Sequence, residues 1–367
     1  MKKFAFRFAV ISLSALFFIC AGDPGQQAHA ATKKKSKSSS HSSGGIKTLY
    51  KNAETGEFIR QGNRGIIVSR DSLGVVRAMN TCTVNPNAGR KYSEAISEYA
   101  ARLDGDGVRV YQLIAPTQGE FYMPEMVSTI GAEQRAIERT ASFLTEAVTP
   151  VFVIDTLRNH MDEDIYNRTD HHWAPLGAYY AAKAFAKVAG VPFRPLSDYT
   201  PREVKDYVGT MYKFSGDPEV KNYPETFVYY MPPEGYEAEF ITYKLSNNKT
   251  VGESEPHKDN FFRHFNDGSG AAYSTFMGGD TRTVKVTNTG GPKGRKLLIV
   301  KDSYGNAVAS NLFGSFEEVH VIDFRYFPHN LVKYVKDQGI TDLVFINTIQ
   351  LAMAPNTATR LQTMLNK

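Results

Sequence analysis

The stretch KLLIVKDSYGNA, residues 296–307, combines a buried strand with the start of a helix. Its first half is an aliphatic run bounded by lysines, which is typical of a strand inside a parallel sheet. Ser303 follows this strand and precedes a Tyr-Gly-Asn turn, so its hydroxyl is expected at the carboxyl edge of the sheet. Backbone N–H groups at the start of a helix can stabilise an oxyanion there. Ser303 is therefore a candidate nucleophile, although serine also caps helices for structural reasons alone.

Strands and helices alternate along most of the chain. Apolar runs predict further strands at 108–115, 151–154, 319–322 and 343–346. Apolar residues at helical spacing predict helices at 92–103, 132–147, 175–189 and 330–338. This alternation predicts an α/β fold in which a largely parallel sheet carries helices on both faces. Sites in such sheets form at the carboxyl ends of the strands.

The stretch RTDHHWAPLGAYYA, residues 168–181, opens one of these helices with Pro175 at its first helical position. The preceding turn holds Asp170, His171 and His172. An imidazole at this place can reach a reaction centre. A carboxylate two residues earlier can accept its ring N–H and fix its tautomer. Asp170 and His172 are therefore candidates for the acid and base that would activate a serine.

Two adjacent histidines beside an aspartate are also found among metal ligands. The other histidines of the folded part are scattered singly, with no pair at metal-ligand spacing. We therefore expect no metal and no other cofactor. A metal-dependent hydrolase that uses His171 and His172 remains an alternative, and so does a turn in which both histidines are only hydrogen-bonded.

Residues 1–30 have the pattern of a signal peptide. Three basic residues precede an apolar run at 8–21 that is too short to span a bilayer, and Ala-His-Ala ends the segment. Cleavage after Ala30 would export the protein to the periplasm or cell envelope. Lipidation at Cys20 fits the sequence poorly, because Ile19 stands where a small residue is required.

Residues 31–45 (ATKKKSKSSSHSSGG) contain no large apolar residue and are expected to form a disordered linker. We expect residues 46–367 to form one domain, with a β-rich insertion at about 201–294, where tyrosine, glycine, asparagine and charged residues dominate. The aromatic side chains of this insertion suit stacking on sugars, but strand packing explains them equally well.

The net charge of +5 comes from the first 45 residues, so the folded part is close to neutral. A nucleic-acid partner is not expected. Cys82 is the single cysteine after the predicted cleavage site. A disulfide framework and a zinc site built on cysteines are therefore excluded, and Cys82 is expected to pack as a small apolar residue.

The two chemical segments together resemble the SGNH hydrolase superfamily. Its members place the nucleophile in a Gly-Asp-Ser block after the first strand and the histidine in an Asp-x-x-His segment near the chain end. Here the Asp302-Ser303 pair and residues 170–181 are similar to these blocks, in reversed order. The resemblance therefore implies a circularly permuted SGNH-like, flavodoxin-like sheet, in which strands ending near Asp323, Asn347 and Pro116 follow in the family's order.

Within that group, residues 169–177 resemble the DHHW family, named for its Asp-His-His-Trp motif. The Asp-x-His spacing is also similar to that of the SGNH-like domains of alginate O-acetylation proteins. The resemblance implies a Ser303–His172–Asp170 triad, with His172 and not His171 as the base. Further candidates for the oxyanion hole or for substrate binding are Asn347, Tyr304, Asn306, Arg325 and His171. Two departures concern this part: Lys301 replaces the family's glycine, and no Gly-x-Asn-Asp block surrounds Asn347.

These features predict an exported serine-dependent O-acetyltransferase or carbohydrate esterase. Its expected partners are a polysaccharide or acyl-ester substrate of the cell envelope and, for a transferase, a membrane protein that hands over the acyl group. The alternative is a non-catalytic carbohydrate-binding or scaffold protein that has kept an SGNH-like fold.

Overall fold

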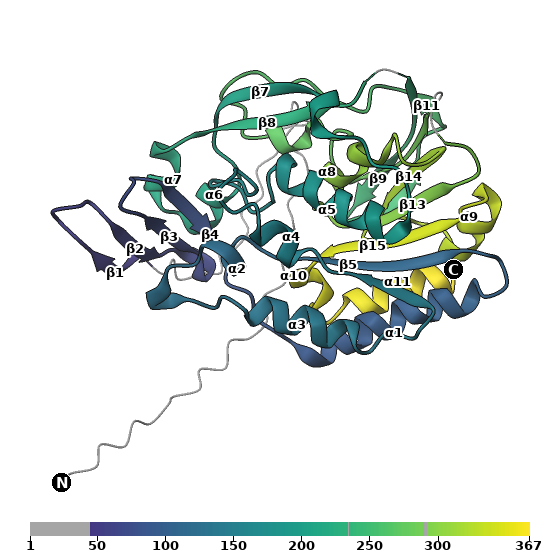
Figure 1. The fold of residues 1–367 in the computed structure, drawn as a ribbon, viewed down its shortest axis with the longest axis horizontal. Coiled ribbons are helices and arrows are strands. Elements are labelled where there is room, and N and C mark those ends of the chain that lie inside the picture. Colours follow the sequence, from purple (N-terminus) through teal and green to yellow (C-terminus); the bar gives the residue numbers. More distant parts are fainter. Residues whose placement is uncertain (1–44, 234, 289–291) are drawn as a thin grey trace, which may run out of the picture. The chain divides into compact units, whose positions relative to one another are not determined.

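The computed structural model describes residues 45–233, 235–288 and 292–367, all within one compact unit (Figure 1). The predicted signal peptide, 1–30, and all but the last residue of the predicted linker, 31–45, lie outside the described residues. In the part that is described, no helix is both long and apolar enough to cross a membrane.

Five parallel strands form the centre of the fold, in the order β14–β13–β15–β5–β6. Their bounds are Arg109–Ala115 (β5), Val148–Val151 (β6), Lys296–Lys301 (β13), Glu318–Asp323 (β14) and Asp342–Thr348 (β15). Ile299 of β13 pairs with Val321 of β14 and Val344 of β15, and all three side chains are buried. Counted from β13, the strand order is 2-1-3-4-5, the order of flavodoxin-like sheets. The mixed α/β fold is thus confirmed, while the circular permutation stays a prediction that this order favours.

The same sheet continues on the β14 side with antiparallel strands. These are β12 (Arg282–Asn288), β9 (Tyr236–Ser246), β10 (Lys249–Glu253) and the short β11 (His257–Lys258). They belong to the region 201–294 that the sequence analysis set apart as an insertion. Because β12 pairs with β14, and β9 in turn pairs with β12, the backbone groups at these edges are satisfied and not left open. The expectation of a largely parallel sheet therefore holds for the centre and not for this side.

Helices cover both faces of the central sheet (Figure 1). One face carries α1 (Pro86–Arg102), α3 (Ala132–Ala141), α9 (Leu331–Gln338), α10 (Ile349–Ala352) and α11 (Thr357–Leu365). The other carries α5 (Pro175–Ala189) and α8 (Gly305–Ala309), which pack on each other. The helix α5 begins with Pro175 and ends at Gly190, whose φ of 63° suits glycine.

Three elements have bounds that differ from the predicted ones by three residues or more. The helix predicted at 92–103 begins earlier, at Pro86. The helix predicted to reach residue 147 ends at Ala141. The strand predicted at 151–154 lies at 148–151, because Ile154 begins the short helix α4 (Ile154–Arg158). Pro150 is accommodated inside this strand because β6 is the edge strand next to β5, where a missing N–H is tolerated.

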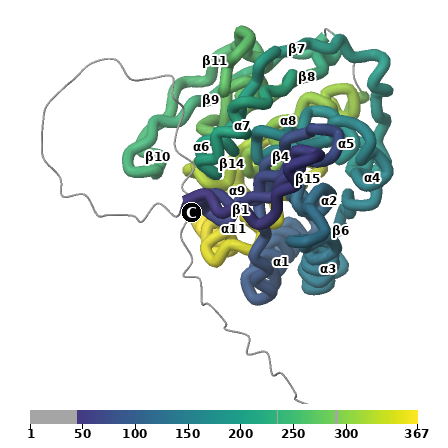
Figure 2. Tube along the Cα trace, turned by 90° about the vertical axis from the view of Figure 1, so that its left-hand side faces the viewer, coloured from purple at the N-terminus to yellow at the C-terminus, as the bar shows by residue number. Residues whose placement is uncertain are grey.

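Four short strands near the described N-terminus form a separate antiparallel sheet that was not predicted from the sequence (Figure 1; purple tube in Figure 2). They are β1 (Lys47–Lys51), β2 (Phe58–Gln61), β3 (Ile67–Arg70) and β4 (Val76–Met79). The helices α6 (Met211–Ser215) and α7 (Pro218–Asn222) pack against β4. The strands β7 (Thr200–Tyr207) and β8 (Glu225–Met231) pair with each other. The backbone N–H of Ala78 in β4 donates to Arg168 O at 3.0 Å, which joins the small sheet to the segment that carries the two histidines.

Candidate active site

Ser303 lies on the turn between β13 and α8, at the carboxyl edge of the central sheet. The buried carboxylate of Asp302 holds this turn, because Oδ1 accepts from the N–H of Tyr304 at 3.0 Å and Oδ2 from that of Thr348 at 2.7 Å. Gly305 allows the helix to pack closely, since a Cβ there would lie 2.4 Å from the Cβ of Lys301. The side chain of Ser303 is half-buried. Its hydroxyl is therefore fixed in place but accessible.

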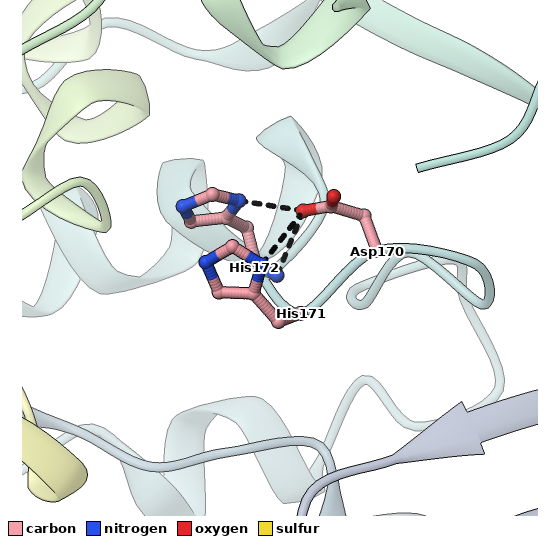
Figure 3. A group of neighbouring side chains, drawn as sticks. All are labelled: Asp170, His171 and His172. Carbon is pink, nitrogen blue, oxygen red and sulfur yellow. Dashed lines mark hydrogen bonds and ion pairs between the residues drawn. The ribbon is translucent and has the colours of Figure 1, made fainter. Parts of the chain in front are cut away.

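His172 connects Ser303 with Asp170. Its Nε2 lies 2.7 Å from Ser303 Oγ and its Nδ1 lies 2.5 Å from Asp170 Oδ1. The backbone N–H of His172 donates to the same carboxylate oxygen at 3.1 Å. Figure 3 shows both imidazoles of the motif turned toward this oxygen, with their other nitrogens pointing away from it. The structure thus brings the three residues together in an arrangement that lets His172 take a proton from Ser303.

The carboxylate of Asp170 is buried and fully bonded. Its Oδ2 accepts from the backbone N–H and the hydroxyl of Thr210, both at 2.8 Å. Burial acts to raise the pKa of Asp170, but the imidazoles of His171 and His172 and the hydrogen bonds outweigh it and hold the pKa well below its ordinary value. The carboxylate is therefore ionised and acts only as an acceptor.

Hydrogen bonds lock the motif turn to its surroundings. Glu225 accepts from the backbone N–H groups of Arg168 and Thr169, both at 2.7 Å. The indole Nε1 of Trp173 donates to Tyr304 O at 3.0 Å, and the hydroxyl of Tyr304 donates to the backbone oxygen of His171. The motif is thereby fastened to the turn that carries the serine. The hydroxyl of Tyr304, a candidate for the oxyanion hole, is used in this bracing.

Tyr273 covers the imidazole of His172. The two rings are stacked with centroids 3.7 Å apart and planes 5° apart. The hydroxyl of Tyr273 donates to Ser303 O at 3.0 Å. One side chain, from the short 3-10 helix Ala272–Thr275, therefore contacts both His172 and Ser303.

His171 lies beside His172, with ring centroids 3.8 Å apart. Its Nδ1 is 2.7 Å from Thr210 Oγ1 and 3.7 Å from Asp170 Oδ1. Burial, together with the neighbouring His172, lowers the pKa of His171 to about 3. This imidazole is therefore neutral at any ordinary pH.

Asp170, His171 and His172 also form a group that satisfies the proximity expected of metal ligands. One potential ligand atom from each lies within 4.8 Å of the others. The Nδ1 atoms of both histidines already have partners, however, one in Asp170 and the other in Thr210. Coordination through them would break the chain that reaches Ser303, so this hydrogen bonding favours the metal-free arrangement.

The side chains of the remaining oxyanion candidates form no hydrogen bond with Ser303 in the part of the chain that the structure describes, although the backbone N–H of Asn306 donates to Ser303 O at 3.2 Å. Asn347 is fully buried, its Oδ1 accepts from the hydroxyl of Tyr92 at 2.7 Å, and its Nδ2 is buried without a partner. The Nδ2 of Asn306 donates to Asp280 at 2.8 Å. Of the backbone donors, the N–H of Ser303 is the one on this turn without a partner among the described residues.

Comparison with known proteins gives the family. Residues 69–322 match the family model described as DHHW protein. The crystal structure of a DHHW family protein from Eubacterium siraeum is 37% identical, with a TM-score of 0.71, and the match covers 82% of this chain and 95% of that one. The chain belongs to the DHHW family.

One more distant structure shares the fold of this DHHW protein, and a second is only weakly similar to it. Bacillus cereus PatB1, solved with a sulfonyl adduct, is 18% identical with a TM-score of 0.60, and the match covers 78% of this chain and 97% of that one. The O-acetyltransferase domain of Pseudomonas putida AlgJ is 12% identical with a TM-score of 0.43, over 84% of this chain and 99% of that one. No curated protein matches the chain.

A buried charge network lies behind the serine turn of the DHHW protein. Lys301 Nζ contacts Asp280 Oδ1 at 2.9 Å and Asp323 Oδ2 at 3.2 Å. Arg325 contacts the same two carboxylates at 2.8 Å and 2.6 Å. Burial acts to raise the pKa of Asp280, but Lys301 and Arg325 outweigh it and leave the pKa below its ordinary value. Lys301, which stands where the resemblance to SGNH hydrolases implied a glycine, is one cation of this network, and Arg325 is the other.

Several residues that shape the DHHW site were not predicted from the sequence. Thr210, Glu225, Tyr273 and Asp280 all come from the region 201–294 and touch the motif or the serine turn from outside. They belong to no motif, and their separation from Asp170 and Ser303 along the chain carries no periodic signal. In contrast, Trp173 stands inside the motif itself.

Proposed function

We propose that this DHHW protein is a serine-dependent acyltransferase or esterase that acts on acetylated glycans outside the cytoplasm. The observation that carries the proposal is the continuous chain of short contacts from Ser303 Oγ through the His172 imidazole to Asp170. Catalysis by serine needs a base in hydrogen-bond contact with the hydroxyl and a third group that fixes the base. All three are held here without substrate.

In the first half-reaction, Ser303 Oγ attacks the ester carbonyl while its proton passes to His172 Nε2. Asp170 stabilises the imidazolium that forms. The oxyanion accepts a hydrogen bond from the backbone N–H of Ser303, which has no other partner in the described residues. Asn347 supplies the second donor in this proposal, because its Nδ2 is unpaired at the end of the adjacent strand β15. The imidazolium then returns its proton to the departing alkoxide.

In the second half-reaction, a hydroxyl attacks the acyl-serine ester and gives its proton to His172 Nε2. The bond between the acyl carbon and Ser303 Oγ breaks, and Oγ takes the proton back. Water as the attacking group makes the protein an esterase, and a sugar hydroxyl makes it a transferase. A membrane protein that delivers the acyl group would be a partner of the transferase alone.

Several observations support a glycan as the substrate and a location outside the cytoplasm. The N-terminal 30 residues have the pattern of a signal peptide, and the near-neutral folded part is unsuited to nucleic acid. The motif resembles the alginate O-acetylation proteins. The fold is shared with PatB1, whose solved structure carries a sulfonyl adduct. Sulfonyl reagents attach to activated hydroxyl groups, which is the chemistry proposed for Ser303.

Turnover of a chromogenic acetyl ester and of an acetylated glycan tests the proposal. We expect the wild type to release acetate from at least one of them. The rate of acetate release by Ser303→Ala should be at least a hundredfold lower. Ser142→Ala, which changes an exposed serine far from the turn, is the matched control and should keep the rate. Equal inactivity of wild type and Ser303→Ala on every donor and acceptor would contradict the proposal. Glycan binding without turnover would instead favour the carbohydrate-binding or scaffold alternative.

A further inference from the structure

The second histidine of the motif has no part in the chain from Ser303 to Asp170. His171 nevertheless lies in the same site, with its ring centroid 3.8 Å from that of His172. Its side chain is 16% exposed, so part of the imidazole reaches solvent. The proposed mechanism assigns no role to this second imidazole beside the base.

The hydrogen bonds fix which nitrogen of His171 carries the proton. The single hydroxyl proton of Thr210 is donated to Asp170 Oδ2, which as part of an ionised carboxylate can only accept. Thr210 Oγ1 must therefore accept from His171 Nδ1, which lies 2.7 Å away. Nδ1 thus carries the proton of the neutral ring, and Nε2 is left with a lone pair.

His172 is in the same tautomer. Its Nδ1–H donates to Asp170 Oδ1, and its Nε2 accepts from Ser303. Figure 3 shows the Nε2 atoms of both rings on the side away from Asp170. Within the described residues, His171 Nε2 has no hydrogen-bond partner. Two hydrogen-bond acceptors therefore lie on the same side of the paired rings, the side on which His172 Nε2 contacts Ser303 Oγ.

We propose that His171 Nε2 and His172 Nε2 together bind a vicinal diol, so that the acyl acceptor is a sugar with two neighbouring free hydroxyls. This inference rests on the proposed function and names its acceptor. One hydroxyl gives its proton to His172 Nε2 as its oxygen attacks the acyl-serine carbon. Its neighbour keeps its proton and donates a hydrogen bond to His171 Nε2. Ser303 Oγ leaves the acyl carbon and takes the proton back from His172. His171 keeps its proton and stays neutral throughout this step.

This assignment fits the protonation of the pair better than the alternatives. A cationic His171 would repel the imidazolium that forms on His172, whereas a neutral acceptor does not. Neighbouring hydroxyls of a sugar ring are about as far apart as hydrogen-bonded atoms. An isolated alcohol would satisfy one of the two nitrogens and leave the other without a partner inside the complex, which is unfavourable.

A competition between two acceptors tests the inference. The enzyme receives a chromogenic acetyl ester as donor, with equal amounts of trans-1,2-cyclohexanediol and cyclohexanol, and the two acetylated products are quantified. Both acceptors meet the same acyl-enzyme, so the product ratio is independent of how fast the acyl-enzyme forms. The wild type should favour the diol by roughly tenfold or more, the effect of one additional hydrogen bond in a closed site.

Two variants separate binding from structural support. His171→Asn places an amide N–H where Nδ1–H contacts Thr210 but has no atom at the Nε2 position. In this variant the product ratio should fall to the value expected from the number of hydroxyl groups that each acceptor carries. His171→Gln offers an amide at the Nε2 position and should restore part of the preference. Thermal midpoints of both variants show that they are folded.

The outcomes are distinct. Release of chromophore by the wild type with an unchanged product ratio in His171→Asn would overturn the inference and leave the proposed function standing. A wild type that transfers to both acceptors without preference, or only hydrolyses the ester, would overturn it equally. A wild type that releases no chromophore would contradict the proposed function, and the inference falls with it.

Discussion

Tyr273 lies flat on the imidazole of His172, with ring centroids 3.7 Å apart and planes 5° apart, and donates its hydroxyl proton to the backbone oxygen of Ser303 at 3.0 Å. The same side chain thus limits the rotation of the proposed base and fixes the turn of the proposed nucleophile. Positioning of this kind lowers a reaction barrier because the reacting groups need no reorganisation. Tyr273 comes from the region 201–294, which therefore completes the site as well as extending the sheet.

Changing Tyr273 should lower turnover in two steps. Tyr273→Phe keeps the stacked ring and loses the hydrogen bond, so we expect a loss of roughly fivefold in kcat for a chromogenic ester. Tyr273→Leu loses both contacts, and the loss should reach about a hundredfold with little change in KM. Tyr243→Phe, which removes a hydroxyl bonded to Thr283 elsewhere in the same region, is the control. Equal rates for Tyr273→Leu and the wild type would show that the stacking has no positioning role.

Thr210 is expected to matter through Asp170. Thr210→Val removes the hydroxyl that donates to Asp170 Oδ2 at 2.8 Å and keeps the size of the side chain. A hydrogen bond to a buried charge is worth about 2 kcal/mol, so both the free energy of unfolding and turnover should fall. Thr210→Ser retains the hydroxyl and should stay near wild type. Urea denaturation and ester hydrolysis check this pair, and identical behaviour of the two variants would count against the role of the hydroxyl.

Lys301 should be essential to stability, because its charge is buried between Asp280 and Asp323. Lys301→Met leaves two buried carboxylates with Arg325 as their one cation, and removing one partner of a buried pair costs about 3 to 5 kcal/mol. Lys333→Met removes an exposed lysine that is 2.7 Å from Asp337 and should cost less than about 1 kcal/mol. Chemical denaturation of both variants compares the two ion pairs directly. A loss in Lys301→Met no larger than that in Lys333→Met would contradict the network.

Glu133 should make stability depend on pH. Burial raises the pKa of this carboxyl to about 7, while hydrogen bonds from Thr117 oppose the shift. The folded state therefore holds the proton more tightly than the unfolded state, and stability falls as pH rises from the ordinary glutamate pKa to about 7. The total loss is about 3 kcal/mol. Thermal midpoints of Glu133→Gln should lack this decline, and those of the exposed Glu138→Gln should keep it. A decline of the same size in Glu133→Gln would place its origin elsewhere.

The sequence predicted the parts of the fold whose signals are local. The run that became β13 and the helix α5 that opens at Pro175 were placed correctly because burial and helical period act over a few residues. The contact between Asp170 and His172 was predicted for the same reason, as the two residues lie on one turn. The short strands β1 to β4 were missed because each spans only four or five residues and mixes polar with apolar side chains.

The rest of the site depends on contacts between distant segments. Tyr273 contacts His172 from about a hundred residues away, and Thr210 contacts Asp170 from the position just before α6, so no spacing in the sequence predicts either contact. The oxyanion candidates show that the type of a residue does not by itself predict its hydrogen-bond partner. Tyr304 and Arg325 are donors of the expected chemistry, but the structure uses Tyr304 to brace His171 and Arg325 to pair Asp280 and Asp323.

The proposed mechanism requires His172 to activate Ser303, and labelling with a sulfonyl fluoride measures this activation. Intact mass and peptide mapping after treatment should show one sulfonyl group, carried by Ser303, in the wild type. The adduct should be absent from Ser303→Ala and should form at least tenfold more slowly in His172→Gln. A wild type that remains unlabelled, or a label on Ser303 that forms equally fast without His172, would contradict this mechanism.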